Sequence, residues 1–300
     1  MSKKVPSASE QAVDQLIVCN YNVNFVFTRD GLGDDNSKQV FNALMESDAD
    51  VICLQETHGG FEQFLLTYSQ GQLTKSYPHY VFYHHGGAGG QAFFSKFPFV
   101  PGSEQIIELK QNGVEGSWFP MHLISVNVTK NGKSSVVQFV NVHLRPPLND
   151  DGSAHLWTAY ITNRFRLGEV RYLMKKLEEQ GVVTLSENKE QIEGVKNAMI
   201  ILGDYNEHDN DPALSWLTNK NQSNKQVFRD ALKDYVPSSR ETHRWPIKLM
   251  WGYVTYWSHK RLDHCVYSVD SLQCTNCKVL DGYEDNASDH QPIISTFKLL

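Results

Sequence analysis

Short apolar runs that end in polar residues recur along the chain, and this pattern limits the folds that it can adopt. The clearest run is Met199–Leu202, which stops at Gly203 and is followed directly by Asp204, Tyr205 and Asn206. Apolar runs of this length bounded by glycine are typical of buried strands, because a helix needs a longer segment. Such a strand delivers a carboxylate and an amide to the edge of a sheet. An ordinary Asp/Asn turn after a strand is the alternative interpretation.

Strand-like runs and amphipathic segments alternate through the rest of the sequence without an internal repeat or a linker. Helices are predicted from an N-cap at Ser37, through Phe61–Tyr68, over His155–Gln180 and over Pro212–Leu217, and Asn131-Gly132 predicts a hairpin turn. Many strands with intervening helices in one uninterrupted chain predict two packed sheets covered by helices. Strands are predicted at Leu16–Val23, Val51–Leu54, Tyr80–Tyr83, Gln91–Ser95, Gln105–Leu109, Met121–Val128, Ser135–His143, Tyr253–Trp257, Leu262–Val269, Leu272–Leu280 and Pro292–Leu299.

The composition is that of an ordinary globular protein, with 40% hydrophobic and 21% charged residues. We predict one domain over residues 1–300, with residues 1–14 as a flexible N-terminus. The net charge of −6 argues against a broad electrostatic surface for nucleic acid. No apolar run approaches the roughly 18 residues of a transmembrane helix, and the N-terminus has no apolar core of a signal peptide. With Cys19, Cys53 and Cys265 inside strand-like runs, we expect reduced cysteines and an intracellular, cytoplasmic location.

Polar residues stand at six strand edges, and together they suit one kind of chemistry. Carboxylates and an amide hold a hard divalent cation, a further carboxylate orients or deprotonates water, and histidines contact phosphate or protonate a leaving group. A single residue of this kind is usually a helix cap or part of a turn. Six such edges are what metal-assisted phosphoester hydrolysis requires. The residues are Asn22, Glu56, His143, Asp204 with Asn206, Asp263, and Asp289 with His290.

The chain resembles the endonuclease/exonuclease/phosphatase superfamily, which has deoxyribonuclease-like and apurinic-endonuclease-like members. Each matching piece is short, but seven of them occur in the order of the family and span residues 16 to 299. They are NYNVNF (20–25), DVICLQET (50–57), GGQAFFSKFP (89–98), NVHL (141–144), ILGDYN (201–206), RLDHCVYS (261–268) and SDHQPI (288–293).

The resemblance implies a four-layer α/β/β/α sandwich with the site at one end of the two sheets. It implies that Glu56, Asn22 and Asp289 surround a Mg²⁺ or Mn²⁺ ion, with Glu56 as the principal ligand. Asp204 would align and activate water, Asn206 would hold the scissile phosphate, and His143 would stabilise developing charge or assist the leaving group. His290, oriented by Asp263, would contact the phosphate or transfer a proton. The implied reaction is in-line attack of water on phosphorus.

The sequence constrains the chemistry more than it constrains the substrate specificity. His143 stands where apurinic endonucleases carry a tyrosine, so the chain looks closer to the deoxyribonuclease, sphingomyelinase and tyrosyl-DNA phosphodiesterase branches. The stretch Pro237–Arg261 interleaves basic and aromatic residues, which meet phosphates and stack on bases. The alternative is that some of these rings are core. The predicted substrate contacts are Arg145, Arg244, Trp251 and Trp257.

Three functions are therefore weighed for this chain. The first is a metal-dependent phosphodiesterase that acts on DNA, RNA or a nucleotide-like phosphoester, with no membrane span and no obligate protein partner. The second is the same chemistry on a phospholipid or another small phosphoester. The third is an inactive binding module on the same fold, against which the full set of polar residues argues.

Overall fold

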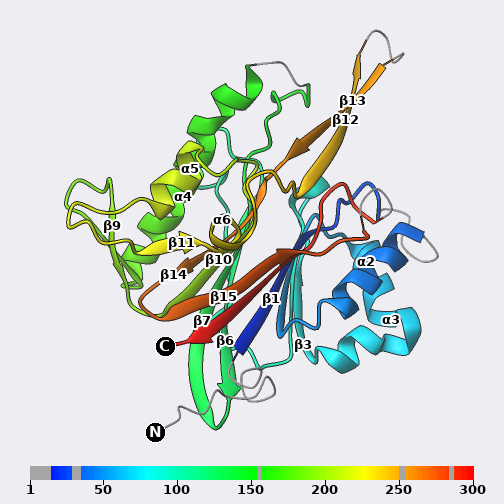
Figure 1. The fold of residues 1–300 in the computed structure, drawn as a ribbon, viewed down its shortest axis with the longest axis horizontal. Coiled ribbons are helices and arrows are strands. Elements are labelled where there is room, and N and C mark those ends of the chain that lie inside the picture. The colour runs from blue at the N-terminus through cyan, green and yellow to red at the C-terminus, as the bar shows by residue number, and fades with distance from the viewer. Residues whose placement is uncertain (1–14, 29–34, 154–156, 250–253, 284–286) are drawn as a thin grey trace, which may run out of the picture.

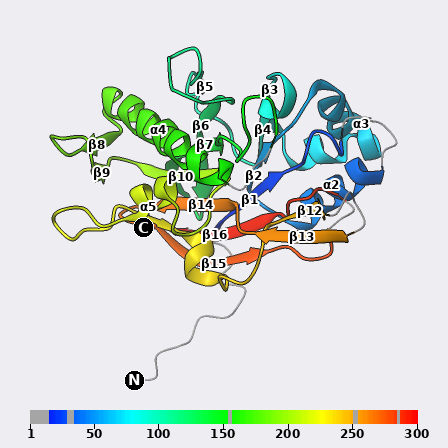
Figure 2. The ribbon, with the colours of Figure 1, turned by 90° about the horizontal axis from the view of Figure 1, so that it is seen from above.

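The computed structural model describes residues 15–28, 35–153, 157–249, 254–283 and 287–300. It contains two six-stranded mixed sheets, packed face to face with helices on both outer faces (Figures 1 and 2). The predicted α/β/β/α sandwich is therefore confirmed. The predicted flexible N-terminus, residues 1–14, lies outside the described residues.

Each sheet contains one parallel pair at its centre. The first sheet has the order β15-β16-β1-β2-β4-β3 and the second has the order β11-β14-β10-β7-β6-β5. The strands of the first are β1 (Gln15–Asn22), β2 (Val51–Gln55), β3 (His79–Tyr83), β4 (Gln91–Ser95), β15 (Leu272–Val279) and β16 (Ile293–Leu299). Those of the second are β5 (Gln105–Ile107), β6 (Met121–Lys130), β7 (Lys133–His143), β10 (Ala198–Asp204), β11 (Phe228–Asp230) and β14 (Asp263–Ser268).

The apolar residues form three layers, as this architecture requires. One cluster fills the space between the two sheets and includes Val51, Phe139 and Ile200. Helices α2 (Asp35–Glu46) and α3 (Gly59–Ser76) cover the first sheet, and α4 (Thr158–Glu179) and α5 (Pro212–Thr218) cover the second (Figure 1). The short helix α6 (Ala231–Tyr235) packs against β14 and β15.

The parallel pairs bring the ends of four strands to the same end of the sandwich. β1 and β2 pair in parallel and end at Asn22 and Gln55, and β7 and β10 pair in parallel and end at His143 and Asp204. β14 runs antiparallel to β10, so its first residue, Asp263, lies opposite Asp204. The predicted strand-edge residues are therefore neighbours because of the topology.

Several elements differ from the sequence prediction. Ser37 lies buried within α2 instead of capping it. The structure adds the hairpin of β8 (Val183–Leu185) with β9 (Ile192–Val195), the strands β11 and β12 (His243–Leu249), and α6. The partner of β12, β13 (Val254–Lys260), overlaps the strand predicted at Tyr253–Trp257. The added segments are short or carry Pro246, which weakens a strand pattern. The β12–β13 hairpin projects from the sandwich in Figure 1.

Two further expectations concern cysteines and membranes. All five cysteines are free and buried, so the predicted reduced core cysteines are confirmed. Within the described ranges, every helix is too short or too polar to cross a membrane.

Candidate active site

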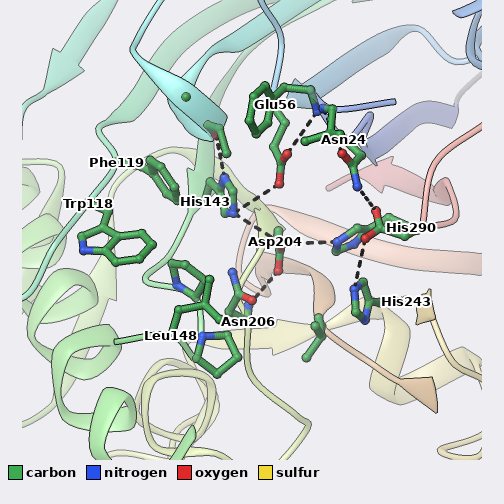
Figure 3. A pocket seen from close by; sticks show the side chains of 18 of the residues that line it. Asn24, Glu56, Trp118, Phe119, His143, Leu148, Asp204, Asn206, His243 and His290 are labelled. Carbon is green, nitrogen blue, oxygen red and sulfur yellow. Dashed lines mark hydrogen bonds and ion pairs between the residues drawn. The ribbon is translucent and has the colours of Figure 1, made fainter. Parts of the chain in front are cut away.

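A cavity of about 560 Å³ opens at the end of the sandwich where the parallel strands finish. Seven of the predicted catalytic and metal residues gather in or directly beside it. Figure 3 shows His143 and Asp204 in the middle, with Asn24, His243 and His290 on one side and Trp118, Phe119 and Leu148 on the other. The predicted residues that line it are Glu56, His143, Asp204, Asn206, Asp289 and His290, and Asn22 lies behind them in contact with Glu56 and Asp204.

Asp204 is the centre of the site, because its carboxylate is reached from both sheets. Its Oδ1 accepts the backbone N–H of Asn206 at 2.8 Å, and its Oδ2 accepts the amide of Asn22 at 3.1 Å. The same Oδ2 lies 3.5 Å from His143 Nε2 and 3.6 Å from His290 Nε2. Burial raises the pKa of Asp204 to about 7, although the charge of His290 opposes this rise.

A glycine is needed immediately before Asp204. Gly203 has a φ of +149°, and a Cβ placed on it would lie 1.8 Å from the carbonyl oxygen of Val142 on β7. Any side chain there would push β10 away from β7 and separate Asp204 from His143. The glycine that ends the apolar run thus permits the close approach of the two catalytic strands.

Asp263 and His290 form a buried pair beside Asp204. His290 Nδ1 lies 2.8 Å from Asp263 Oδ2, which also accepts the hydroxyl of Thr242 at 2.7 Å. Burial alone would lower the pKa of His290, but the charges of Asp263 and Asp204 raise it well above the ordinary value. These two carboxylates therefore favour the cationic form of His290, whose Nε2 faces Asp204 and the cavity. Asp263 thus contacts the ring nitrogen of His290 that faces away from the cavity, and its orienting role stays a prediction.

His143 is held by its other ring nitrogen and by an aromatic neighbour. Its Nδ1 lies 3.1 Å from the carbonyl oxygen of Ala88, which fixes that nitrogen as the donor, and its ring stacks on Phe119 with centroids 4.3 Å apart. Burial lowers the pKa of His143 to about 4. In the neutral imidazole, Nε2 consequently presents a lone pair to Asp204 and Glu56.

Glu56 is the second carboxylate whose charge is poorly compensated. Its Oε1 accepts the amide of Asn22 at 3.0 Å and its Oε2 accepts the backbone N–H of Phe25 at 3.1 Å. Burial raises its pKa to about 7, and the charge of Asp289 adds to the rise. The Asn22 amide nitrogen bridges Glu56 and Asp204, while its oxygen accepts the N–H of Asn24. In this structure Asn22 orients the two carboxylates by donating a hydrogen bond to each.

Asp289 has the opposite environment, since donors surround it. Asn24 donates to its Oδ1 at 2.7 Å, and His243 Nε2 lies 3.5 Å from its Oδ2. Burial opposes ionisation, but these hydrogen bonds and the charge of His290 lower the pKa of Asp289 to about 2. Ligand atoms of His243, Asp289 and His290 lie within 4.8 Å of one another, a separation that one ion can bridge.

The donors in the cavity fit a hard divalent cation. Glu56, Asp204 and Asp289 bring carboxylates into one buried space, where burial raises the pKa values of Glu56 and Asp204 by removing water from their charges. Carboxylate and amide oxygens are the ligands that Mg²⁺ and Mn²⁺ prefer. A cation bound between these residues would offset that charge.

A buried polar layer supports the site from below and joins the two sheets. Gln55 donates to Asn20 at 2.9 Å and to Asn141 of the opposite sheet at 2.7 Å. Asn141 in turn donates to the carbonyl oxygen of Leu54 at 2.8 Å. These side chains are fully buried, so the contacts fix the ends of β1, β2 and β7 relative to one another.

Arg145 does not have the exposed position that a phosphate contact requires. Its side chain is buried, donates to the carbonyl oxygens of Gly116 at 3.0 Å and Leu148 at 2.8 Å, and stacks at 3.6 Å on Trp118. It also pairs with Asp150. The prediction of a substrate contact is therefore corrected: Arg145 organises the wall of the cavity. The sequence shows only that Arg145 stands two positions after His143, and it does not reveal these partners.

Of the other predicted substrate contacts, Arg244 is the one whose side chain the structure describes, and it is not among the described residues that line the cavity. Arg244 pairs with Glu241 at 3.1 Å, and its backbone N–H donates to the carbonyl oxygen of Asp289 at 2.8 Å. Trp251 lies outside the described residues, and Trp257 belongs to β13. Among the described residues that line the cavity, Lys260 supplies the only lysine or arginine side chain.

Several residues that line the cavity were not predicted as site residues, among them Asn24, Ala88, His243, Trp118 and Phe119. Asn24 repeats the spacing of Asn20 and Asn22 after β1, so alternation in NYNVN was a usable signal. Ala88 contributes only a carbonyl oxygen, which residue type cannot reveal. His243 is the first residue of the unpredicted strand β12. Trp118 and Phe119 lie in a loop without a recognisable motif.

A comparison with protein-family models shows the family to which the chain belongs. The Endonuclease/Exonuclease/phosphatase family model matches residues 19–290. The chain therefore belongs to this family of phosphoester-hydrolysing enzymes, which depend on a divalent metal ion, and the predicted family and enzyme class are confirmed. A search of curated protein sequences gives no match.

Solved structures show the same fold at low sequence identity. A D. rerio TDP2 complexed with single-strand DNA product is 16% identical with a TM-score of 0.59, covering 95% of this chain and 99% of that chain. The human Nocturnin catalytic domain with bound sulfate is 14% identical with a TM-score of 0.60, covering 96% and 95%. ANGEL2, a 2',3'-cyclic phosphatase in complex with adenosine-2',3'-vanadate, is 14% identical with a TM-score of 0.63, covering 95% and 96%.

Proposed function

We propose that the protein is a divalent-metal-dependent phosphodiesterase that hydrolyses nucleotide-type phosphodiesters by direct attack of water. The observation that carries this proposal is the position of Asp204. Its Oδ1 is fixed by Asn206, and its Oδ2 faces both His143 and His290 across less than 4 Å. A carboxylate fixed in this way is ready to receive a proton from water beside the phosphate.

Asp204 is assigned as the general base. Its pKa of about 7 is close to neutral pH, and a general base is most effective when its pKa lies near the working pH. Asn206 holds Asp204 with its backbone N–H, and its side chain is anchored to the carbonyl oxygen of Leu144 at 3.0 Å. The second hydrogen of that amide is assigned to an oxygen of the scissile phosphate.

The two histidines are assigned different tasks because their environments differ. His290 is kept positive by Asp263 and stabilises the negative charge that develops on the phosphate oxygens. His143 starts neutral, and an anionic phosphate in the cavity would raise its pKa. The proton that it then takes up at Nε2 is available for the leaving oxygen.

Glu56, Asp289 and, after rotation of its amide, Asn22 would hold the metal ion, for which we propose Mg²⁺ or Mn²⁺. A bound divalent cation supplies charge neutralisation at the phosphate and orients its oxygens. Asn24 and the Phe25 backbone keep the two carboxylates in place through the hydrogen bonds described above.

The shape and charge of the cavity support a small unit of substrate, such as a nucleotide or the end of a strand. The described wall carries a single lysine, Lys260, whereas a long duplex needs many phosphate contacts. Nucleotide ligands in the TDP2 and ANGEL2 structures support the same class of substrate. Five free, buried cysteines support our proposal of a reducing, intracellular setting.

The proposal is tested by offering purified protein with Mg²⁺ or Mn²⁺ four substrates: plasmid, single-stranded oligonucleotides, sphingomyelin and bis-p-nitrophenyl phosphate. We expect metal-dependent cleavage of oligonucleotides and of the generic diester. Asp204→Asn and His290→Asn should each lower kcat by at least ~10²-fold. If sphingomyelin alone is turned over, the proposed nucleotide substrate is wrong and a lipid substrate replaces it. Absence of turnover on all four would favour an inactive binding module.

A further inference from the structure

One side of the cavity is apolar although its centre is crowded with carboxylates. Trp118, Phe119 and the segment Pro146–Leu148 line this side (Figure 3). We call these residues the aromatic wall. Phe119 stacks on His143, and Trp118 contacts Phe119 edge to face with centroids 6.1 Å apart. The wall therefore begins in contact with a catalytic side chain.

The aromatic wall is held in place by residues behind it. The Arg145 guanidinium lies 3.6 Å from the Trp118 ring and donates to the carbonyl oxygens of Gly116 and Leu148. One side chain thus pins both loops that make the wall. Gly116 is also closed in by Phe165 of α4, whose ring would lie 2.5 Å from a Cβ at that position. A prearranged planar surface loses little entropy when a flat group binds to it.

We propose that the aromatic wall binds one unstacked nucleobase, that of a nucleotide joined to the scissile phosphate. This inference rests on the proposed phosphodiesterase function and names the group that the site recognises beside the phosphate. Indole, phenyl and proline surfaces stack on bases with little sequence preference, because every base has a π-face. A base in a paired duplex can bind to the wall only after it has left the base stack of the duplex.

The position of the wall favours a base over a lipid chain. Phe119 contacts the ring of His143, and Pro146 follows that histidine by three residues, so the wall lies beside the reacting phosphate. A nucleobase is one sugar away from its phosphate. An acyl chain is separated from its phosphate by the lipid backbone, so it begins further from the reacting phosphate than the wall does.

The test compares cleavage of a thymidine dinucleotide with cleavage of two analogues that carry an abasic tetrahydrofuran on one side of the phosphate. The wild-type protein should cleave one analogue about 5- to 150-fold less efficiently in kcat/KM, the range expected for a base stacked on an aromatic side chain. In Trp118→Ala this ratio should fall close to one, and in Trp118→Phe it should partly return. The ratio is measured within each variant, so general loss of activity cancels.

Two further variants complete the design. Trp157→Ala removes an indole that is 69% exposed and outside the cavity wall, and it should keep the wild-type ratio. Leu148→Ala shortens the other side of the wall and should lower the ratio if Trp118→Ala does not fold.

The outcomes separate the inference from the proposed function. Equal cleavage of all three substrates by the wild-type protein would overturn the base site and leave the phosphodiesterase in place. A ratio that survives in both Trp118→Ala and Leu148→Ala would overturn it as well. Sphingomyelin hydrolysis that depends on Trp118, without a base preference, would assign the wall to a lipid. Failure to cleave the dinucleotide and bis-p-nitrophenyl phosphate would instead refute the proposed function.

Discussion

Asp263→Asn should lower kcat by about 10²- to 10⁴-fold, because it removes the charge that keeps His290 positive and correctly oriented. Asp263 Oδ2 lies 2.8 Å from His290 Nδ1 and accepts the Thr242 hydroxyl at 2.7 Å. A hydrogen bond to a charged group is worth about 1.5–3 kcal/mol, which alone accounts for roughly 10- to 150-fold. The remainder comes from the histidine, which becomes neutral more readily when its partner is an amide.

The chain contains a matched control for this substitution. Asp230 and His264 form a second fully buried pair, with Oδ2 and Nδ1 also 2.8 Å apart, but neither residue lines the cavity. Burial opposes the charge on both members, yet each holds the other ionised, so the pKa of Asp230 is lowered and that of His264 is raised. Asp230→Asn should therefore cost a similar 1.5–3 kcal/mol of stability and leave kcat close to wild type.

Both variants are assayed with bis-p-nitrophenyl phosphate between pH 5 and 9, and unfolding is followed by circular dichroism. The folded-state pKa of His290 is raised, so its charged form is present below that pKa and is lost as the pH rises through it. Without the Asp263 charge this loss occurs at lower pH, and residual activity should decline earlier on the alkaline side. A kcat for Asp263→Asn within tenfold of wild type would refute the assigned pair. An equal loss in Asp230→Asn would show that the effect is structural.

Three further substitutions address the metal, a buried acid and a glycine. Glu56→Gln should weaken Mn²⁺ binding in calorimetry, and an unchanged titration would remove Glu56 from the ligands. Burial raises the pKa of Glu169 to about 8 from 4.5, so its contribution to stability is complete below pH 4.5 and is lost as the pH rises through about 8. Glu169→Gln should thus flatten urea-measured stability across this window, and an unaltered slope would contradict the assignment. Gly203→Ala should destabilise the fold by several kcal/mol and lower kcat, since its Cβ meets the Val142 carbonyl; a near-normal melting temperature would count against this.

The sequence was sufficient to predict the sheets and several of the polar residues that gather in the cavity, for a physical reason. Buried strands leave strong apolar runs, and polar residues that recur at the ends of six such runs indicate more than the caps and turns that a single one would indicate. Asp204, His143 and Asp263 could be named because each closes or opens such a run. Parallel pairing of β7 with β10 then brings two of them side by side without further information.

The outer parts of the site could not be predicted in this way. Asn24 and His243 both contact Asp289, which lies far from each of them in sequence. These contacts depend on the paths of the loops between strands. Ala88 orients His143 through a backbone carbonyl, for which any residue type would serve. Such roles depend on three-dimensional position, whereas the periodicity of a sequence reports only which face of an element is buried.

Arg145 illustrates how a residue type can mislead when its partners are distant in sequence. Its backbone N–H donates to Glu169 at 2.9 Å and its carbonyl accepts Arg166 at 2.9 Å, while Arg166 pairs with Glu207 at 3.1 Å. All four side chains are buried. The network ties the chain just after His143 to the chain just after Asn206 through α4. Removing one partner would leave buried polar groups without compensation, so these residues hold together the strand ends that carry His143 and Asp204.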